Sequence, residues 1–433
     1  MITEEVQNAE AAFVRHRVGV GGSSIAAVDA TSAQRSGSAA QSALEAWESS
    51  PVRFPYGAVI AHFHAVGRIR AEPNLIARLD AIPVRRQDVH LAAWLPMTCD
   101  QVDGGYATYA GLGVHQTAVG IGIASPAGRG LNSVRAGTDE VTVAVLAELV
   151  RTEAEAAIVG GANPAAHARL RSAARLLARA NDLAPGYPID PTAATDLTSA
   201  LAAAEEPLVL LAEAAERAVK AIGEQVSPVV AQAVRRSVLP VTRLHDEFMF
   251  IRCIQIFEAL YEQIALAVRE ARDAVVAGKI GYGADVIAAA SERLTVLPAL
   301  FRVLGTMPPS VFAVIRGYTS GRSAVQSRSY RQIESACAPR QLLAGKDVPD
   351  VPWNGPTLQD VYLSNRTCPD ADRLASELRR LDESWRRMKR SHWGITLRII
   401  GEVPGTGGTS GAAYLQAAAA TPLFPALEIR ELQ

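Results

Sequence analysis

Residues 385–411 read WRRMKRSHWGITLRIIGEVPGTGGTSG, an amphipathic segment that runs into a glycine-rich loop. Apolar side chains recur at helical spacing from Leu374 onward, so we predict one long helix over residues 369–400. His392 falls on the apolar stripe of this helix, and Thr406 follows fourteen residues later inside the loop. The stretch predicts a mainly α-helical protein in which a histidine faces the interior.

The imidazole of His392 has two interpretations. Neutral imidazole is a good ligand for haem iron, and a rigid helix fixes the orientation of the ring. The alternative is a core histidine that is satisfied by a backbone carbonyl, which is the more frequent situation for a lone histidine on a helical stripe. The glycine-rich loop is equally ambiguous, because it lacks the lysine of a phosphate-binding loop and also fits a linker.

A second helix is predicted over residues 240–274, of which residues 245–264 read HDEFMFIRCIQIFEALYEQI. Phe250 and Ile254 are four residues apart, so they share one face of this helix. An isoleucine neither accepts a proton nor donates a hydrogen bond. Ile254 therefore supplies no base to whatever lies against that face.

A third informative segment, residues 304–334, reads LGTMPPSVFAVIRGYTSGRSAVQSRSYRQIE. Arg316 lies in it, after Phe312 and before Ser323. The planar fork of an arginine can hold a carboxylate through two charge-assisted hydrogen bonds. The alternative for Arg316 is a surface ion pair.

Taken in order, these segments resemble the distal-side helix, the substrate-arginine segment and the proximal haem-ligand helix of the tryptophan 2,3-dioxygenase and indoleamine 2,3-dioxygenase superfamily. The resemblance implies non-covalent haem b with His392 as the proximal iron ligand. It implies that Arg316 pairs with the substrate carboxylate and that Thr406 lies near its ammonium group. The implied substrate-binding residues are Phe250, Ile254, Phe312, Arg316, Ser323 and Thr406. No catalytic residue is assigned.

Residue 254 departs from the pattern of this family. Tryptophan dioxygenases place a distal histidine four residues after the matching phenylalanine, where this chain has Ile254. Indoleamine dioxygenases also lack that histidine. Ordinary tryptophan dioxygenase activity is thereby questioned, whereas oxygenase chemistry is not excluded.

The amino-terminal part resembles the superfamily only weakly. Residues 51–150 look somewhat like the front part of the pyrrolnitrin-pathway enzyme that rearranges chlorinated tryptophan. We expect two domains: an extension over residues 1–135, and a helical-bundle haem-binding catalytic domain over residues 136–433 with the motifs within 240–411. The extension is predicted to contain a small mixed region of short strands and glycine turns at 87–130.

The remaining elements follow from periodicity and from glycine and proline breaks. Residues 1–50 are predicted to be partly disordered around a short helix near 41–47, and residues 338–368 are predicted to form a loop. Further helices are predicted at 57–82, 139–159, 164–181, 194–235, 283–304, 308–318 and 322–337.

Two clusters of polar residues receive structural interpretations. In the predicted helix at 57–82, His62 and His64 point apart, so they are not expected to chelate a metal together. The basic run Arg386, Arg387, Lys389 and Arg390 is expected to form a solvated helix face, with one member able to meet a haem propionate.

Composition restricts the partners and the location. The chain has 433 residues with 43 basic and 44 acidic side chains, so nothing electrostatic favours nucleic acid or a membrane surface. The start of the chain lacks a basic segment followed by an apolar one, so a cytoplasmic protein is expected. Its four cysteines are scattered without a haem-attachment motif, which agrees with haem b.

These observations predict a haem-dependent oxidoreductase, an oxygenase that acts on tryptophan or an indole derivative in natural product biosynthesis. Its co-substrate would be dioxygen or hydrogen peroxide. One alternative is a monooxygenase or peroxygenase that hydroxylates tyrosine or tryptophan, and another is a non-catalytic haem carrier or sensor of the same fold. The only partner that we expect is a small aromatic substrate, and a homo-oligomer is compatible with the sequence.

Overall fold

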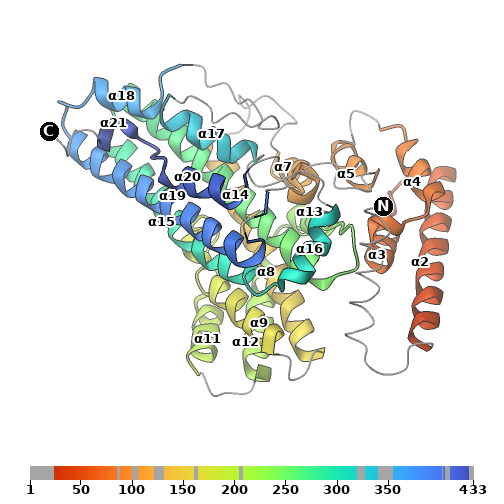
Figure 1. The fold of residues 1–433 in the computed structure, drawn as a ribbon. Helices are drawn as coiled ribbons and strands as arrows, with labels where there is room; N and C mark the ends of the chain where they lie inside the picture. The colour runs from red at the N-terminus through yellow and green to blue at the C-terminus, as the bar shows by residue number, and fades with distance from the viewer. Residues whose placement is uncertain are drawn as a thin grey trace.

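The computed structural model describes residues 24–84, 88–99, 106–120, 131–159, 164–203, 208–318, 327–339, 355–401, 403–404 and 410–428. Within these ranges every regular element is a helix (Figure 1). The mainly α fold predicted from the sequence is confirmed.

The helices of the first half of the chain are α2 (Ser24–Ser49), α3 (Tyr56–Val66), the 3-10 helix η1 (Arg68–Arg70), α4 (Pro73–Asp80), α5 (Val89–Cys99), α6 (Tyr106–Ala110), α7 (Leu112–Ala118), α8 (Leu131–Val159), α9 (Pro164–Leu177), α10 (Ala180–Leu183), α11 (Pro191–Ala202) and α12 (Leu208–Gln225). Those of the second half are α13 (Pro228–Arg236), α14 (His245–Val276), α15 (Ile280–Leu304), α16 (Pro309–Tyr318), α17 (Arg328–Cys337), α18 (Leu358–Ser364), α19 (Ala371–Ile399), α20 (Ala412–Ala420) and α21 (Pro425–Glu428).

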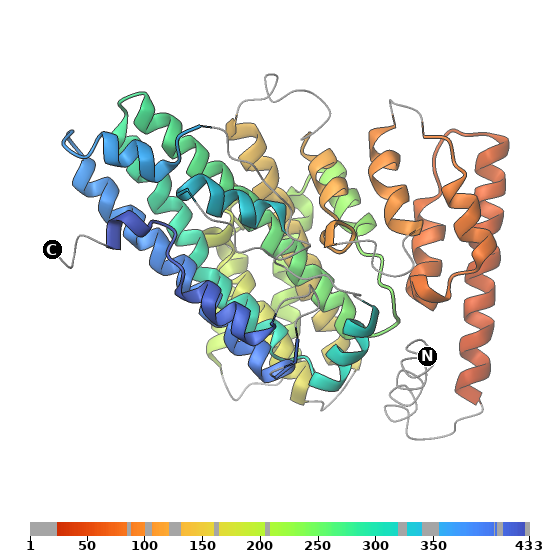
Figure 2. The ribbon, with the colours of Figure 1, turned by 45° about the horizontal axis from the view of Figure 1, so that its top comes forward.

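Helix α14 is the centre of the main bundle. Its 32 residues bury side chains on all sides, as expected of a helix that has packed neighbours all round. Helices α8, α15 and α17 pack directly on it, and α19 packs along α15 (Figures 1 and 2). The long helices therefore form a bundle in which α14 and α19 both line α15.

A second, smaller hydrophobic core belongs to α2–α5 and includes Ala233 of α13 and Leu239 of the segment that follows it. The backbone N–H groups of Arg68 and Ile69 donate to the carbonyls of Pro240 (3.0 Å) and Val241 (3.2 Å). The buried Arg68 guanidinium also donates to Leu239 O at 2.7 Å. The segment that leads into α14 is thus held by the amino-terminal helices.

Gly67 makes this junction possible. Its φ of 77° lies in the region that favours glycine, and a Cβ there would sit 2.6 Å from Val241 O. A side chain at residue 67 would therefore push η1 away from the segment before α14.

The predicted strands at 87–130 are wrong wherever the structure describes this region. Residues 89–99, 106–110 and 112–118 are helical. Leu91, Trp94 and Leu95 are buried at i, i+3 and i+4, which is helical spacing rather than the alternation of a strand. Gly111 adopts the left-handed conformation between α6 and α7.

Other boundaries also differ from the predictions. The single helix predicted at 194–235 is divided into α11, α12 and α13, because Pro228 opens α13 behind its Ser227 cap and cannot continue α12. The loop predicted at 338–368 contains α18, which Thr357 and Asp360 start with a capping box. Helix α2 is far longer than the predicted 41–47.

Among the described helices, none is by itself long and apolar enough to cross a membrane. The pair α15 and α16 meets the requirement by length and composition only, with a bend of 101° between the two helices.

Candidate functional site

The apolar stripe of α19 is deeply buried along most of its length and then leaves the core. Leu378, Leu381, Trp385 and Met388 are almost completely covered. His392, on the same face one turn later, is only half-buried. The stripe therefore reaches the edge of the described core at His392, near the carboxyl end of the helix.

The ring of His392 stacks on Phe301 of α15, with the centroids 5.4 Å apart and the planes at 17°. Loss of solvent around the ring lowers the pKa of His392 to about 4, so the imidazole is neutral at physiological pH. Among the described residues, none forms a hydrogen bond with its ring nitrogens. The described residues therefore do not form the alternative arrangement, in which a backbone carbonyl satisfies a core histidine.

Helix α14 forms the wall opposite α19. The Tyr261 ring lies 5.8 Å from that of Trp385, and its hydroxyl donates to Met388 Sδ at 3.7 Å. Phe257, one turn before Tyr261, and His392, one turn after Met388, both contact Phe301. The two helices therefore run antiparallel on either side of Phe301.

Ile254 and Phe250 continue the α14 face beyond Phe257, about one and two turns further on. Both side chains are half-buried, although they project from the most buried helix of the bundle. This part of α14 lies toward the same open end as His392, so the described wall at this end is apolar.

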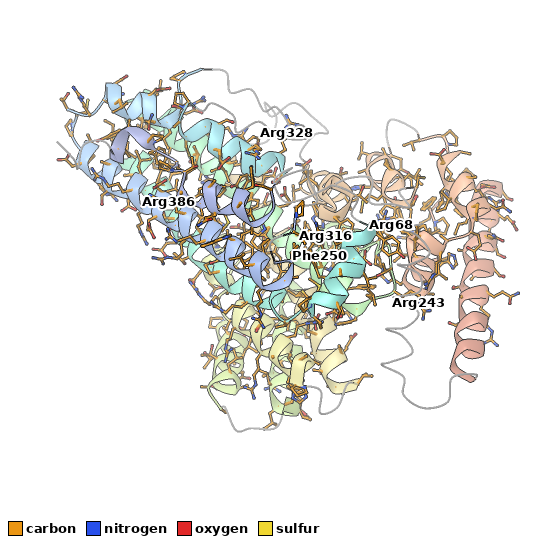
Figure 3. All side chains as sticks on the ribbon, in the orientation of Figure 1. Arg68, Arg243, Phe250, Arg316, Arg328 and Arg386 are labelled. Carbon is orange, nitrogen blue, oxygen red and sulfur yellow. The ribbon has the colours of Figure 1, made fainter. Side chains whose placement is uncertain are left out.

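Helix α16 closes the same end of the bundle and contacts α19 (Figure 2). The Phe312 ring meets that of Phe250 edge-on at 5.8 Å. Arg316, one turn after Phe312, donates from Nη2 to the carbonyl of Pro404, just before the glycine-rich loop. Figure 3 labels Phe250 on α14 and Arg316 on α16. Two segments that are distant in sequence thus bring apolar rings and a cation together.

The donor set at this end fits haem. Iron in haem needs one neutral imidazole from the protein, and His392 presents on a rigid helix a ring whose nitrogens no described residue bonds. The macrocycle needs apolar walls, which Phe301, Phe250 and Phe312 supply. The Arg316 guanidinium projects from α16, a helix of the same group.

Comparison with known proteins finds several tryptophan 2,3-dioxygenases that are similar to the chain. No family model matches it. The tryptophan 2,3-dioxygenase of Pseudomonas aeruginosa is 27% identical over 240 residues, covering 43% of this chain and 82% of that protein. The enzyme of the same name from Burkholderia multivorans is 29% identical over 235 residues, covering 43% and 76%. That from Polaromonas is 28% identical over 240 residues, covering 45% and 82%.

These comparisons support the resemblance of the chain to the tryptophan 2,3-dioxygenase and indoleamine 2,3-dioxygenase superfamily. Ile254, which the resemblance matches to the distal histidine of tryptophan dioxygenases, lies on the α14 wall, and this match stays a prediction. The weak resemblance of residues 51–150 to the pyrrolnitrin-pathway enzyme stays a prediction, as does the domain division at residue 135.

Two predicted members of the superfamily site, Ser323 and Thr406, lie outside the described residues. Their assigned roles remain predictions. The described positions Phe250, Ile254, Phe312, Arg316 and His392 gather at one end of the bundle.

Phe301 and Tyr109 contact the site without having been singled out from the sequence. Phe301 stacks on His392, and only its place in an apolar helical run gave a signal. Tyr109 approaches Phe250 edge-on at 6.1 Å and donates its hydroxyl to Glu247 Oε1 at 2.6 Å. Tyr109 was missed because its segment was read as strands and turns.

The basic run before His392 is only partly solvated. Lys389 is buried, and its ammonium group pairs with Glu334 Oε1 at 2.7 Å and donates to Ala418 O. The prediction of a solvated face is therefore wrong at Lys389. The neighbouring Arg390 keeps its contact with solvent while its guanidinium group pairs with Glu383.

The other histidines considered have structural partners. His62 bonds Glu72 Oε2 (2.6 Å) and Ser36 Oγ (3.0 Å), whereas His64 bonds Val238 O (2.9 Å). The prediction that the two imidazoles point apart is confirmed.

Proposed function

We propose that this chain is a haem-dependent oxygenase that acts on tryptophan or a closely related aromatic amino acid. The proposal rests on His392, a neutral imidazole whose ring nitrogens bond no described residue, at the end of the bundle where Phe250, Phe312 and Arg316 lie. The name of the relatives, tryptophan 2,3-dioxygenase, supports the substrate class.

His392 would hold the iron, and bound haem would supply the activation of dioxygen or peroxide. The edge-on pair Phe250 and Phe312 would pack the aromatic ring of the substrate and exclude water from it. Arg316 would bind the carboxylate, and its bond to Pro404 O would keep its guanidinium aimed at this end of the bundle. Held at both ends, the substrate ring would have one orientation, which supplies regioselectivity.

Ile254 favours a second candidate reaction. Because its side chain cannot accept a proton, no base at residue 254 assists removal of the substrate's ring proton. Hydroxylation of tyrosine or tryptophan, with insertion of one oxygen atom, makes no demand on such a base. We further propose a role in specialised metabolism, with a substrate related to but different from tryptophan, as the reason for the departure at residue 254.

The deciding experiment uses the full chain reconstituted with haem. We expect tryptophan or tyrosine to shift the Soret band and to be consumed with dioxygen or with hydrogen peroxide. Isotopically labelled oxidant then counts the inserted atoms, with two for a dioxygenase and one for a monooxygenase or peroxygenase. A haem protein whose spectrum responds to neither amino acid and that turns over neither would overturn the oxygenase proposal and favour a carrier or sensor.

A further inference from the structure

A second hollow lies on the other side of α14. It is a cleft of about 530 Å³, walled by residues of α3, α8, α13 and α14. Arg252 lines it and comes two residues after Phe250, so it projects from roughly the opposite side of the helix. The cleft is therefore separate from the site that contains Phe250, Ile254 and His392.

Arg252 is fixed by one end of its guanidinium group. It is 6% exposed, and Nη1 donates to Val234 O (3.0 Å), Ser237 Oγ (3.3 Å) and Gln255 Oε1 (2.8 Å). No described residue accepts a hydrogen bond from Nε or Nη2, and none of the described carboxylates forms an ion pair with Arg252. Burial lowers the pKa of this guanidinium to about 10, so it remains charged at neutral pH.

The carboxylates around the cleft are engaged elsewhere. Glu148 and Glu155 both pair with Arg151, at 2.7 Å and 2.5 Å. Glu153 pairs with Arg169 at 3.8 Å and also bonds the ring of His245. Each acidic side chain in the wall therefore has a cationic partner other than Arg252.

Two further arginines of α13 add uncompensated charge. Arg235 is exposed, and no described carboxylate pairs with it. Arg236 donates to Gln232 Oε1 and stacks over the Tyr56 ring at 3.7 Å, again without a described carboxylate partner. Glu148 attracts Arg252 without a direct ion pair, and it is shared with Arg151. The wall therefore carries four arginines against three glutamates, so an anionic ligand would compensate the remaining positive charge around the buried Arg252.

The remaining wall of the cleft is apolar and includes Ile60, Leu149, Val238, Phe248 and Met249. We propose that the cleft binds a small organic carboxylate, whose carboxylate group is held by Arg252 and Arg235 and whose apolar body lies against Phe248 and Met249. A carboxylate suits the site because two adjacent N–H donors of one guanidinium match its two oxygens. Since the glutamates are already paired, the ligand requires no ammonium group.

The test measures binding of 3-phenylpropionate to the full chain by isothermal titration calorimetry. We expect saturable binding with one site beyond any at Arg316, so binding should persist in the Arg316→Leu variant. Arg252→Gln should weaken it by about tenfold or more, the loss typical of removing one side of a buried charge pair. Arg235→Gln should also weaken it, and because Arg235 is exposed and unpaired this variant tests the site without disturbing the fold.

The matched control is Arg366→Gln, which removes the same charge from an exposed arginine after α18. It should bind as the native chain does. The proposal is overturned if 3-phenylpropionamide binds as tightly as the acid, or if neither Arg252→Gln nor Arg235→Gln changes the affinity. Competition by inorganic phosphate at equal concentration would show a general anion site and would overturn the assignment to an organic carboxylate.

Discussion

Replacing Arg316 with leucine tests the substrate role of this residue. The side chain is half-buried and bonds the carbonyl of Pro404, so leucine, which keeps the apolar stem and is a good helix former, should leave α16 folded. Truncating one side of a fully buried, hydrogen-bonded charge pair costs about 2–5 kcal/mol. Because Arg316 keeps contact with solvent, we expect the lower part of this range, about 2–3 kcal/mol, which corresponds to a roughly 30- to 150-fold rise in Kd.

The assay titrates tryptophan into haem-loaded protein and follows the Soret band. Haem content should be unchanged in Arg316→Leu, and Arg302→Leu, at an exposed arginine of α15, should bind tryptophan normally. Tryptamine, which lacks the carboxylate, should bind native protein as weakly as tryptophan binds Arg316→Leu, and the mutation should not weaken it further. If tryptamine binds the native protein as tightly as tryptophan does, the reasoning is refuted.

Three further predictions concern the scaffold and the wall. Gly67→Ala should lower the free energy of unfolding by at least about 2 kcal/mol, because its backbone conformation is nearly restricted to glycine and a Cβ would strike Val241 O. The control Gly57→Ala, with open space around it, should change the free energy of unfolding little. Equal denaturation midpoints for the two variants would contradict this. Burial lowers the pKa of His115 from 6.5 to about 3, so the unfolded chain takes up the proton first as the pH falls. The free energy of unfolding should therefore decrease between pH 6.5 and pH 3, by up to about 1.4 kcal/mol per pH unit, and less steeply in His115→Gln. The same pH dependence of unfolding in His115→Gln would rule this out. The native kcat/KM profile should lack a limb near pH 6–7, and Ile254→His should introduce one at or below about pH 6.5; a native limb that is lost on mutating another histidine would reveal a base at a different place.

How far the sequence determines this fold is clearest in α14 and α19. The apolar repeat of α19 predicted its register, and with it the face that carries His392. The spacing of Phe250 and Ile254 likewise predicted a shared face on α14. Helical periodicity is strong over such lengths, so these elements and their faces are readable from residues alone.

Other features depended on contacts between distant segments. The stacking of Phe301 on His392 joins α15 to α19, and no local pattern indicates it. No local pattern marks Arg252, and its lack of a direct ion pair with any described carboxylate results from the packing of α8 and α13 around it. The short helices α5–α7 were misread because glycines between short apolar runs resemble strand turns as closely as helix breaks.

The central claim is that His392 binds haem iron, and reconstitution of a His392→Ala variant tests it most directly. Native protein and His90→Ala, which removes a histidine of α5 outside the site, should each take up haem with the same Soret band. His392→Ala should keep its helical circular dichroism and lose stable haem binding. Haem retained by His392→Ala at the native level and with the native spectrum would contradict the account.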